Sequence, residues 1–396
     1  MLKYLLLLIG ILFIPAANAQ TTTTCRNATS FGADPTGVNP SNAAFSNAVA
    51  ATDGVHICVY FPSGVYSFTS TLSVSLPAGS STASVTIQGD GSETTQLRFN
   101  PGVDGVHLTL NNAFHSFHIR NLSLLAGDKS TTTRGVFVQN NATINSAQSH
   151  IDHATIRGAD GFNQAYRWGR GVSLYQVSNV NVSDTTIVGS SDGAAYASDG
   201  VCFIAEGTAA VIPVQINVIS SQMNYCKYGI YYGNYLQGLQ ISTTNFVGNA
   251  HGIFLPSGQY GNDQLSVSAS QFNNSATDIY TASLIDGVTI TGNNFYGGAV
   301  SGTICVNLNH TDQFAIVGNS FINLGPAGPN QNAIVINDYV ASSGVITGNV
   351  FKNNFVTAIW LTPSSQRVNV QSNSYLGQTN FVINQGTNNS VGGGSM

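Results

Sequence analysis

The sequence predicts an all-β, single-domain fold in which short strands wind into stacked coils, a parallel β-helix. Three observations carry this prediction. An alternating apolar–polar motif returns about every 28 residues. A tight turn divides each copy, and a third short segment that begins with Gly and an apolar residue follows most copies. Alternation with period two is typical of strands, so we expect three short strands per coil and ten or more coils.

The motif is clearest near the C-terminus, in VTITGNNFYG, FAIVGNSFIN, GVITGNVFKN and VNVQSNSYLG. Ten copies align on their last apolar residue, and each has another apolar residue five positions earlier. The earlier residues are Ile119, Ile151, Val182, Val218, Ile241, Val267, Ile290, Ile316, Ile346 and Val370, and the later ones are Leu124, Ile156, Ile187, Met223, Phe246, Phe272, Phe295, Phe321, Phe351 and Tyr375. We expect each set to form one inward-facing row.

The turn inside the motif carries Asn at one equivalent place in four copies, at Asn293, Asn319, Asn349 and Asn373. Asn tolerates the left-handed backbone conformation that a tight bend requires. We therefore expect these residues to make the bend and to hydrogen-bond one another as a ladder along the stack.

The third strand begins Gly-Val or Gly-Ile in six coils, from Gly105 to Gly252. A coil buries little apolar surface by itself, so neighbouring coils must supply the core. The two ends of the stack need caps because an open strand edge has unpaired backbone groups that can pair with another chain. FGADPTGVNPSNAAFSNAVAA, residues 31–51, fits an N-terminal cap. Its helix is predicted to start near Ser41, with Ala44, Phe45, Ala48 and Val49 forming its apolar face.

The segments FGADPTG, VYFPSGVY and VTIQGDGS resemble the N-terminal signature of the pectate-lyase superfamily, a rhamnogalacturonase/epimerase-like group that includes tailspike-like proteins. The signature covers roughly residues 30–100, and the later repeats agree with it. The resemblance implies a right-handed β-helix, as the crossover preference also does. The group holds lyases, hydrolases, epimerases and non-catalytic binders, so function must be argued from the site.

The domain order follows from these patterns. Residues 1–19 read as a signal peptide, with Lys3, a short apolar run and the small-residue pattern Ala17-Asn18-Ala19. Residues 20–104 form the cap and first coils, 105–384 the β-helix repeats and 385–396 a flexible tail. We expect a secreted or periplasmic protein with no membrane contact after signal cleavage, as a monomer or, like many fibre-shaped relatives, a homotrimer.

Composition excludes several classes of protein. Only 7% of residues are charged and the net charge is −5, without a basic stripe, which argues against nucleic acid binding. The chain has five Cys residues. We expect Cys25 to pair with Cys58 and Cys202 with Cys226, which leaves Cys305 free; Cys202 and Cys305 lie four coils apart, too far to bond.

Long loops and charge point to one region for the chemistry. Loops of 12 to 16 residues lead to Val136, Val172 and Val201, whereas later loops have 7. Long loops on a rigid scaffold usually carry function, and eight of the 17 acidic residues fall within 104–206. One position of the third strand, two residues before its first apolar residue, carries polar or ionisable side chains in successive coils. These are Arg134, Arg170, Asp199, Tyr228 and His251. We expect them to stack in one column, about 4.8 Å apart; a plain ion-pair ladder of Arg170 and Asp199 is the alternative.

Asp199 is the main catalytic candidate, with Asp192 or Glu206 as the second carboxylate of a hydrolase, which needs two carboxylates about 5 to 9.5 Å apart. A lyase would instead neutralise a uronate with Arg170 or Arg134 and use Tyr228 or His251 as the base. SDGVCFIAEG has a faint similarity to polygalacturonases, but the rest of that family's pattern is missing. Loops could also assemble a Ca²⁺ site if the protein is a lyase; no other cofactor is expected.

Aromatic and cationic residues supply the expected substrate contacts. Tyr166, Arg167 and Trp168 lie in the long loop GADGFNQAYRWGR, where aromatic rings could stack on sugars and Arg could hold carboxylates. Loop packing is the alternative role. Along the third strands, Tyr175, Tyr231, Phe254, Tyr280 and Trp360 are predicted to face outward as a binding track.

A second cluster competes as a metal site. His118 and Arg120 in one coil should stack on His150 and Asp152 in the next, although outward polar residues are ordinary on strands. We assign no metal there. The sequence therefore predicts an enzyme that cleaves an acidic or branched extracellular polysaccharide, as lyase or hydrolase, with a non-catalytic glycan-binding or adhesive β-helix as the alternative.

Overall fold

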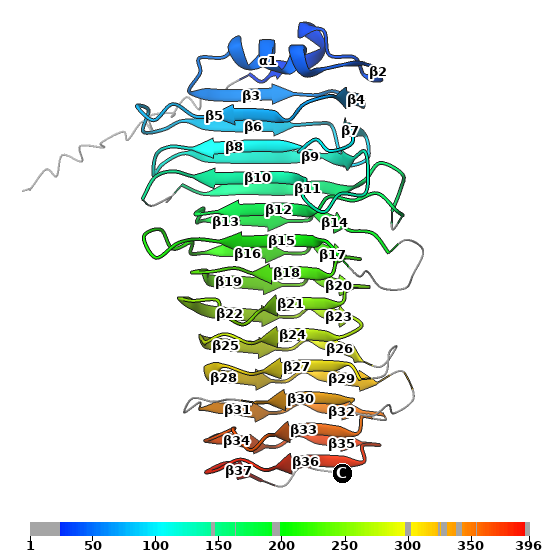
Figure 1. Cartoon of the computed structure of the whole chain (residues 1–396), viewed down its shortest axis with the longest axis vertical. Helices are drawn as coiled ribbons and strands as arrows, with labels where there is room; N and C mark the ends of the chain where they lie inside the picture. Colours follow the sequence, from blue (N-terminus) through cyan, green and yellow to red (C-terminus); the bar gives the residue numbers. More distant parts are fainter. Residues whose placement is uncertain are drawn as a thin grey trace, which may run out of the picture.

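The computed structural model describes residues 24–143, 147–162, 164–191, 199–297, 302–323, 325, 331–337, 343–353 and 355–392. Successive coils stack along the long axis, with the helix at one end and the last strands at the other (Figure 1). All strand pairs are parallel and join equivalent segments of neighbouring coils, which makes the molecule a parallel β-helix, as the sequence predicts.

The strands form three ladders along the stack. Ladder 1 contains β1 (Arg26–Asn27), β3 (His56–Tyr60), β6 (Ser84–Gln88), β9 (Ser116–Ala126), β11 (Ser149–Gly158), β13 (Val180–Ser183), β16 (Ile216–Ile219), β19 (Gln237–Ser242), β22 (Asn262–Ser268), β25 (Ile285–Thr291), β28 (Thr311–Val317), β31 (Gly344–Thr347), β34 (Val368–Gln371) and β37 (Ser390–Val391). The strand β37 pairs with β34, so the segment expected as a flexible tail from residue 385 adds one more strand to the stack.

Ladder 2 runs through the second halves of the long strands β9 and β11. Its other members are β2 (Thr36–Pro40), β4 (Gly64–Phe68), β7 (Thr95–Phe99), β14 (Thr186–Val188), β17 (Gln222–Asn224), β20 (Asn245–Val247), β23 (Gln271–Asn273), β26 (Asn294–Gly297), β29 (Ser320–Asn323), β32 (Val350–Lys352) and β35 (Ser374–Leu376). Ladders 1 and 2 form one 25-stranded sheet because β9 and β11 belong to both.

Ladder 3 is a separate sheet of 12 strands. Its members are β5 (Leu72–Ser75), β8 (Val106–Leu110), β10 (Arg134–Asn140), β12 (Arg170–Tyr175), β15 (Val201–Glu206), β18 (Tyr228–Tyr232), β21 (His251–Leu255), β24 (Thr277–Thr281), β27 (Ile304–Leu308), β30 (Asn332–Ile336), β33 (Thr357–Leu361) and β36 (Asn380–Asn384). This sheet positions most of the candidate functional residues.

The N-terminal end carries a 3₁₀ helix, Ala28–Phe31, and the α-helix α1, Asn42–Ala50. Ala44, Phe45 and Ala48 are buried, on the face that the sequence predicts. The ring of Phe45 stacks 6.4 Å from that of Phe61, so α1 packs onto the first coils through its apolar face.

The core consists of the two predicted rows, and both are confirmed. Every adjacent pair in the row from Ile119 to Val370 is in register, and so is every pair in the row from Leu124 to Tyr375. From Phe246 to Tyr375 the rings stack with centroids 4.7 to 5.4 Å apart. One apolar residue per coil therefore fills the same place in each layer.

In the Gly-Asn turns, one residue makes the bend and the next one makes the hydrogen-bonded ladder. The predicted ladder is confirmed: the Asn293 side chain donates to Asn319, Asn319 to Asn349 and Asn349 to Asn373, over 3.0 to 3.1 Å. The left-handed residue is the one before each Asn, such as Gly292 with φ 67°. The expectation that Asn makes the bend is wrong, because the Asn side chain is needed inside the core.

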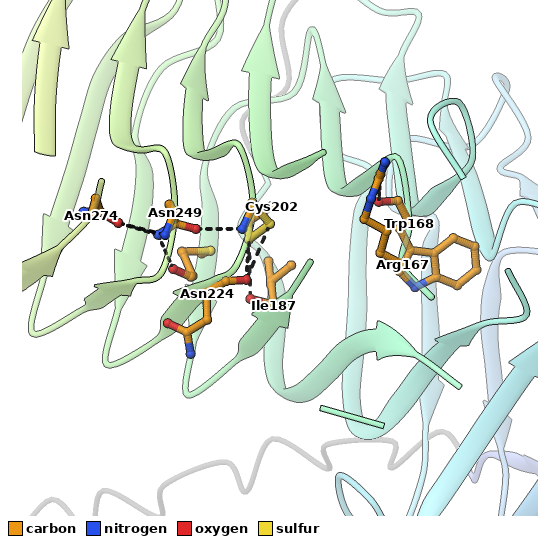
Figure 2. Close-up of a disulfide and its surroundings, with 9 residues drawn as sticks. Arg167, Trp168, Ile187, Cys202, Asn224, Asn249 and Asn274 are labelled. Atoms are coloured by element: carbon orange, nitrogen blue, oxygen red, sulfur yellow. Dashed lines mark hydrogen bonds between the residues drawn. A yellow bond between two sulfur atoms is a disulfide. The ribbon is translucent and has the colours of Figure 1, made fainter. Parts of the chain in front are cut away.

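Both predicted disulfides, Cys25–Cys58 and Cys202–Cys226, are present, and Cys305 is free and buried. Asn249 and Asn274 form a second Asn ladder, in which the Asn249 side-chain amide donates to Asn274 over 2.9 Å. Figure 2 shows Cys202 beside this second ladder. The second disulfide thus joins two consecutive coils in the middle of the stack.

One row on the outer edge of ladder 1 stacks like charges. Asp263, Asp286 and Asp312 are in register on three consecutive coils and form what we call the acidic stack. Partial burial, and then the two neighbouring carboxylates, raise the pKa of Asp286 above its ordinary value. Like charges placed directly opposite one another destabilise a sheet.

Candidate functional site

The outer face of ladder 3 presents a row of side chains at the middle of each strand. In register order the row reads His107, Phe137, Ser173, Ile204, Tyr231, Phe254, Tyr280, Asn307, Val335, Trp360 and Ile383. Tyr231, Phe254, Tyr280 and Trp360 face outward as predicted. Tyr175 is also partly exposed, but it belongs to the next row, where it pairs with Glu206.

The predicted column of ionisable residues differs from the structure at one position. Arg134 pairs with Arg170, and Tyr228 pairs with His251, as expected. Between them stands Val201, which pairs with Arg170 on one side and Tyr228 on the other. Asp199 precedes the strand and does not belong to the column, because Phe203 rather than Val201 enters the core opposite Val172.

Asp199 instead binds a buried arginine. The Arg167 side chain is fully buried, and its Nη2 lies 2.8 Å from Asp199 Oδ2. Its Nη1 donates to the Trp168 carbonyl over 3.2 Å (Figure 2). The same nitrogen also donates to the Ser130 carbonyl. Arg167 therefore ties three long loops together. The prediction that it holds substrate is wrong for this conformation, since no part of its side chain reaches solvent.

Trp168 lies in the core and does not meet solvent. It is 3% exposed, its ring contacts Phe99 edge to face at 5.7 Å, and its Nε1 donates to the Leu124 carbonyl. The prediction that Trp168 stacks on a sugar ring is therefore wrong. Tyr166 and Phe162 from the same loop are exposed and stay available for a ligand.

A shallow pocket of about 260 Å³ lies on the outer face of ladder 3 and brings Arg170, Glu206 and Tyr231 together. Val201, Ile204, Asn234 and Gln259 complete its lining. Arg170 Nη1 lies 3.8 Å from Glu206 Oε1, which is longer than a hydrogen bond. Both side chains are partly exposed, so this pair can exchange its contact for one with a ligand.

Tyr231 stands beside this ion pair on the next coil. Partial burial raises the pKa of its phenol above the ordinary value, and the neighbouring Tyr228 and Glu206 raise it further, while Arg170 opposes them. Tyr231 therefore keeps its proton at neutral pH and can donate it.

An aromatic cluster continues the pocket toward the C-terminus. The ring of Tyr228 stacks on those of Phe254 at 4.5 Å and His251 at 5.5 Å, and Lys227 Nζ lies 5.2 Å from the Tyr228 ring. Burial, helped by Lys227, lowers the pKa of His251 to about 4. His251 is therefore neutral at pH 7, and its ring contributes a flat face to the surface.

Arg134 lies on the coil before Arg170 and is held more firmly. Its Nε lies 3.5 Å from Asp104 Oδ2, and its guanidinium stacks 3.9 Å from the centre of the Phe137 ring. An Arg fixed over an aromatic ring is a preorganised carboxylate donor. Two cations, Arg134 and Arg170, thus stand on adjacent coils of this face.

The carboxylate pair expected for a hydrolase is not assembled from Asp199 and Glu206. Val201 and Glu206 are the first and last residues of β15, so about 16 Å of strand separates them. Asp199 lies beyond Val201, outside the range of about 5 to 9.5 Å that the two-carboxylate mechanism needs. Asp192 lies outside the described residues. Among the described residues that line the pocket, Glu206 is the one carboxylate.

The histidine cluster on ladder 1 forms as predicted, with the rings of His118 and His150 4.8 Å apart and Asp152 opposite Arg120. Within the part of the chain that the structure describes, no three His, Cys, Asp or Glu side chains are grouped to hold a metal ion. In the same part of the chain, no helix has the length and apolar character needed to span a bilayer.

The chain matches the family described as "Rhamnogalacturonase A/epimerase, pectate lyase-like" over residues 25–304. The protein belongs to this family. The match includes every residue of the pocket on ladder 3. No match was found among curated proteins.

Solved structures similar to this pectate lyase-like chain share its fold at low sequence identity. The A-module of the Azotobacter vinelandii mannuronan C-5 epimerase AlgE4 has a TM-score of 0.65 and 14% identity, covering 93% of this chain and 100% of that one. The A-module of the A. vinelandii epimerase AlgE6 gives 0.62 and 16%, covering 93% and 98%. The N-terminal fragment of bacteriophage Phi29 gene product 12 gives 0.55 and 12%, covering 93% and 70%. These likenesses support the parallel β-helix.

Sequence reasoning missed part of the pocket of this pectate lyase-like protein. Ile204, Asn234 and Gln259 line it, yet none belongs to a charged or aromatic pattern. Ile204 could have been found from its place in the outward row, two residues before Glu206. Asn234 and Gln259 lie between strands, where no periodicity marks the direction of a side chain.

Proposed function

We propose that this protein cleaves an acidic polysaccharide by β-elimination on the outer face of ladder 3. The observation that carries the proposal is the meeting of Arg170, Glu206 and Tyr231 in one pocket. These three residues supply a cation for the uronate carboxylate, a base and a proton donor. Membership of a pectate lyase-like family supports a reaction on a uronate.

Each residue has a distinct role in the proposed reaction. Arg170 binds the uronate carboxylate and so acidifies the neighbouring carbon. Glu206 takes the proton from that carbon, and the electron pair forms a carbon–carbon double bond as the glycosidic C–O bond breaks. The Tyr231 phenol, which is protonated at neutral pH, donates a proton to the leaving oxygen. One proton is removed and one is returned, so the step balances without water.

Substrate binding would use the aromatic surface next to the pocket. Tyr228, Phe254 and Tyr280 present stacked rings on consecutive coils, with centroids 4.5 to 5.2 Å apart. Arg134 offers a second carboxylate site on the other side of Arg170. A chain of uronate units lying along the coils would therefore meet cations at one end of the track and rings at the other.

The geometry favours β-elimination over hydrolysis. Hydrolysis needs two carboxylates at a set separation, and the described residues that line the pocket include one, Glu206. β-Elimination needs one base beside a neutralised carboxylate, which Glu206 and Arg170 supply. Export remains part of the proposal, and the two disulfides support it because such bonds persist in oxidising compartments.

The test is a panel of uronate-containing and neutral polysaccharides, followed for ultraviolet-absorbing double bonds and for new reducing ends. We expect double bonds from a uronate polymer and a loss of about 10²- to 10⁴-fold in kcat for Glu206→Gln. Tyr231→Phe should lower kcat, and Arg170→Gln should mainly raise KM. Asp312→Asn, which removes an acid from ladder 1, is the matched control and should leave the rate unchanged.

Several results would contradict the proposal. Reducing ends without double bonds would mean hydrolysis, and loss of activity in folded Asp199→Asn, rather than in Glu206→Gln, would return the catalytic role to Asp199. Thermal unfolding of each variant separates loss of chemistry from loss of fold. Repeating the assay with EDTA tests whether calcium takes part.

A non-catalytic glycan-binding role is the second candidate, and one observation favours it. The outward row continues to Trp360, six coils beyond Ile204, which is a longer track than a single catalytic pocket needs. Retention of a uronate polymer without any product, weakened equally by Tyr231→Ala and Trp360→Ala, would support binding alone.

A further inference from the structure

Ladder 1 carries an uncharged groove that the proposed reaction does not use. The groove has a volume of about 370 Å³ and is lined by Gln148, Asn179, Asn181, Gln215, Asn217 and Gln240, which we call the amide groove. All six lining residues are amides, and all are partly or fully exposed.

The amides form two parallel rows across consecutive coils. Asn181, Asn217 and Gln240 pair in register on β13, β16 and β19, which follow one another along the stack (Figure 1). Asn179 and Gln215 stand two residues earlier, before the first residues of β13 and β16. The rows are therefore about 6.6 Å apart, and their members repeat about every 4.8 Å.

The fold fixes the direction of these side chains. Asn179 and Gln215 both have left-handed backbone conformations, with φ 56° and 57°, which are uncommon for residues other than Gly. Asn217 donates a hydrogen bond from Nδ2 to Asn181 Oδ1 over 2.8 Å. The Asn181 and Asn217 amides are thus held together before any ligand arrives, which lowers the entropy cost of binding at these two residues.

The chemistry of the groove selects an uncharged ligand. A side-chain amide offers two donors and one acceptor, the same mixture that sugar hydroxyl groups need. On the same three coils the neighbouring outward row reads Ser183, Ile219 and Ser242, so it also lacks charge. Ile219 is 38% exposed and gives an apolar contact beside the amides.

We propose that the amide groove binds a neutral polysaccharide. Its repeat along the stack suits an extended ligand with hydroxyl groups at regular intervals, and the lack of cations disfavours the uronate polymer proposed for ladder 3. The two sites lie on different sheets, so both can be filled together. Binding at the amide groove would hold the protein on a mixed matrix and raise the effective concentration of substrate at the pocket.

The test is native gel electrophoresis of the full chain through gels that contain a soluble neutral polymer. The probes are mixed-linkage β-glucan, galactomannan and hydroxyethyl cellulose, with polygalacturonate as the acidic comparison. We expect one neutral polymer to retard the protein, and Asn217→Ala with Gln240→Ala to weaken this binding by tenfold or more. Asn369→Ala is the matched control, because Asn369 is exposed in the same row at the far end of the stack.

The outcomes separate this site from the ladder 3 pocket. Glu206→Gln and Tyr231→Ala should abolish uronate cleavage or binding and leave retardation by the neutral polymer unchanged. Lack of retardation by all three neutral polymers would overturn the proposal. The proposal would also fail if Asn369→Ala or Tyr231→Ala weakened binding of the neutral polymer as much as the double variant does. Concentration-dependent self-association that the double variant removes would also overturn it, because the groove would then be an interface between copies of the chain.

Discussion

Asp278 provides a stability prediction whose size follows from its surroundings. The residue lies in β24, is fully buried and accepts a hydrogen bond from Asn274 Nδ2 over 2.8 Å. Its Oδ2 has no hydrogen-bond partner among the described residues, and Cys305 occupies the equivalent position on the next coil. Burial raises the pKa of Asp278 from 3.8 to about 7, and the contacts with Asn274 and Cys305 only partly oppose this.

The sign of the pH effect follows from the raised pKa. The folded chain holds the Asp278 proton more tightly than the unfolded chain does, so the stabilising effect is complete below about pH 4. It is lost progressively as the pH rises through about 7. A pKa of about 7 against 3.8 corresponds to about 4 kcal/mol in the free energy of unfolding.

Asp278→Asn should remove this dependence. We expect the free energy of unfolding of the variant, relative to the natural chain, to improve by about 4 kcal/mol between pH 4 and pH 8. Urea unfolding at one-unit pH intervals, followed by fluorescence, measures the difference. Asp184→Asn is the control because Asp184 is exposed. If the curves for Asp278→Asn and the natural chain stay parallel over this range, Asp278 is not a buried neutral acid and the reasoning fails.

Three further predictions concern the stack. Asn319→Ala leaves the Asn293 backbone N–H and the Ile290 carbonyl, both in the preceding coil, without their side-chain partner, so urea unfolding should show a loss of about 3 kcal/mol or more. Asp286→Asn relieves the acidic stack; its melting temperature at neutral pH should rise, and the gain should shrink with added salt. An equal gain at high salt would contradict this. Replacing Cys202 and Cys226 together by Ser should cost about 2 to 4 kcal/mol, measured against the natural chain under reducing and non-reducing conditions.

The sequence determined the coil and its core. Both inward rows, the Asn ladder and the two disulfides follow from patterns that repeat locally, because an inward residue at one place in a coil must meet its equivalent in the next. The five-residue separation between Ile119 and Leu124 is set by the short turn, so neither row depends on loop length. The division of the turn between Gly292 and Asn293 was not visible, since both residue types adopt a left-handed backbone.

The candidate site depended on loops and on register, which the sequence does not fix. Gly200-Val201 has the same pattern as Gly171-Val172, but the structure pairs Val172 with Phe203, which moves Asp199 out of the column. Arg167 and Trp168 share a polar, aromatic loop, and only packing decides that one is fully buried with Asp199 while the other enters the core.

Local periodicity therefore determined which residues face the core of this protein, and tertiary structure decided which outward residues meet. Arg170, Glu206 and Tyr231 come from three coils, and no short pattern in the sequence links them. The physical reason is that inward positions must satisfy the same packing in every coil, whereas outward contacts depend on how long loops shift each strand against its neighbour. The amide groove depends on this same stacking.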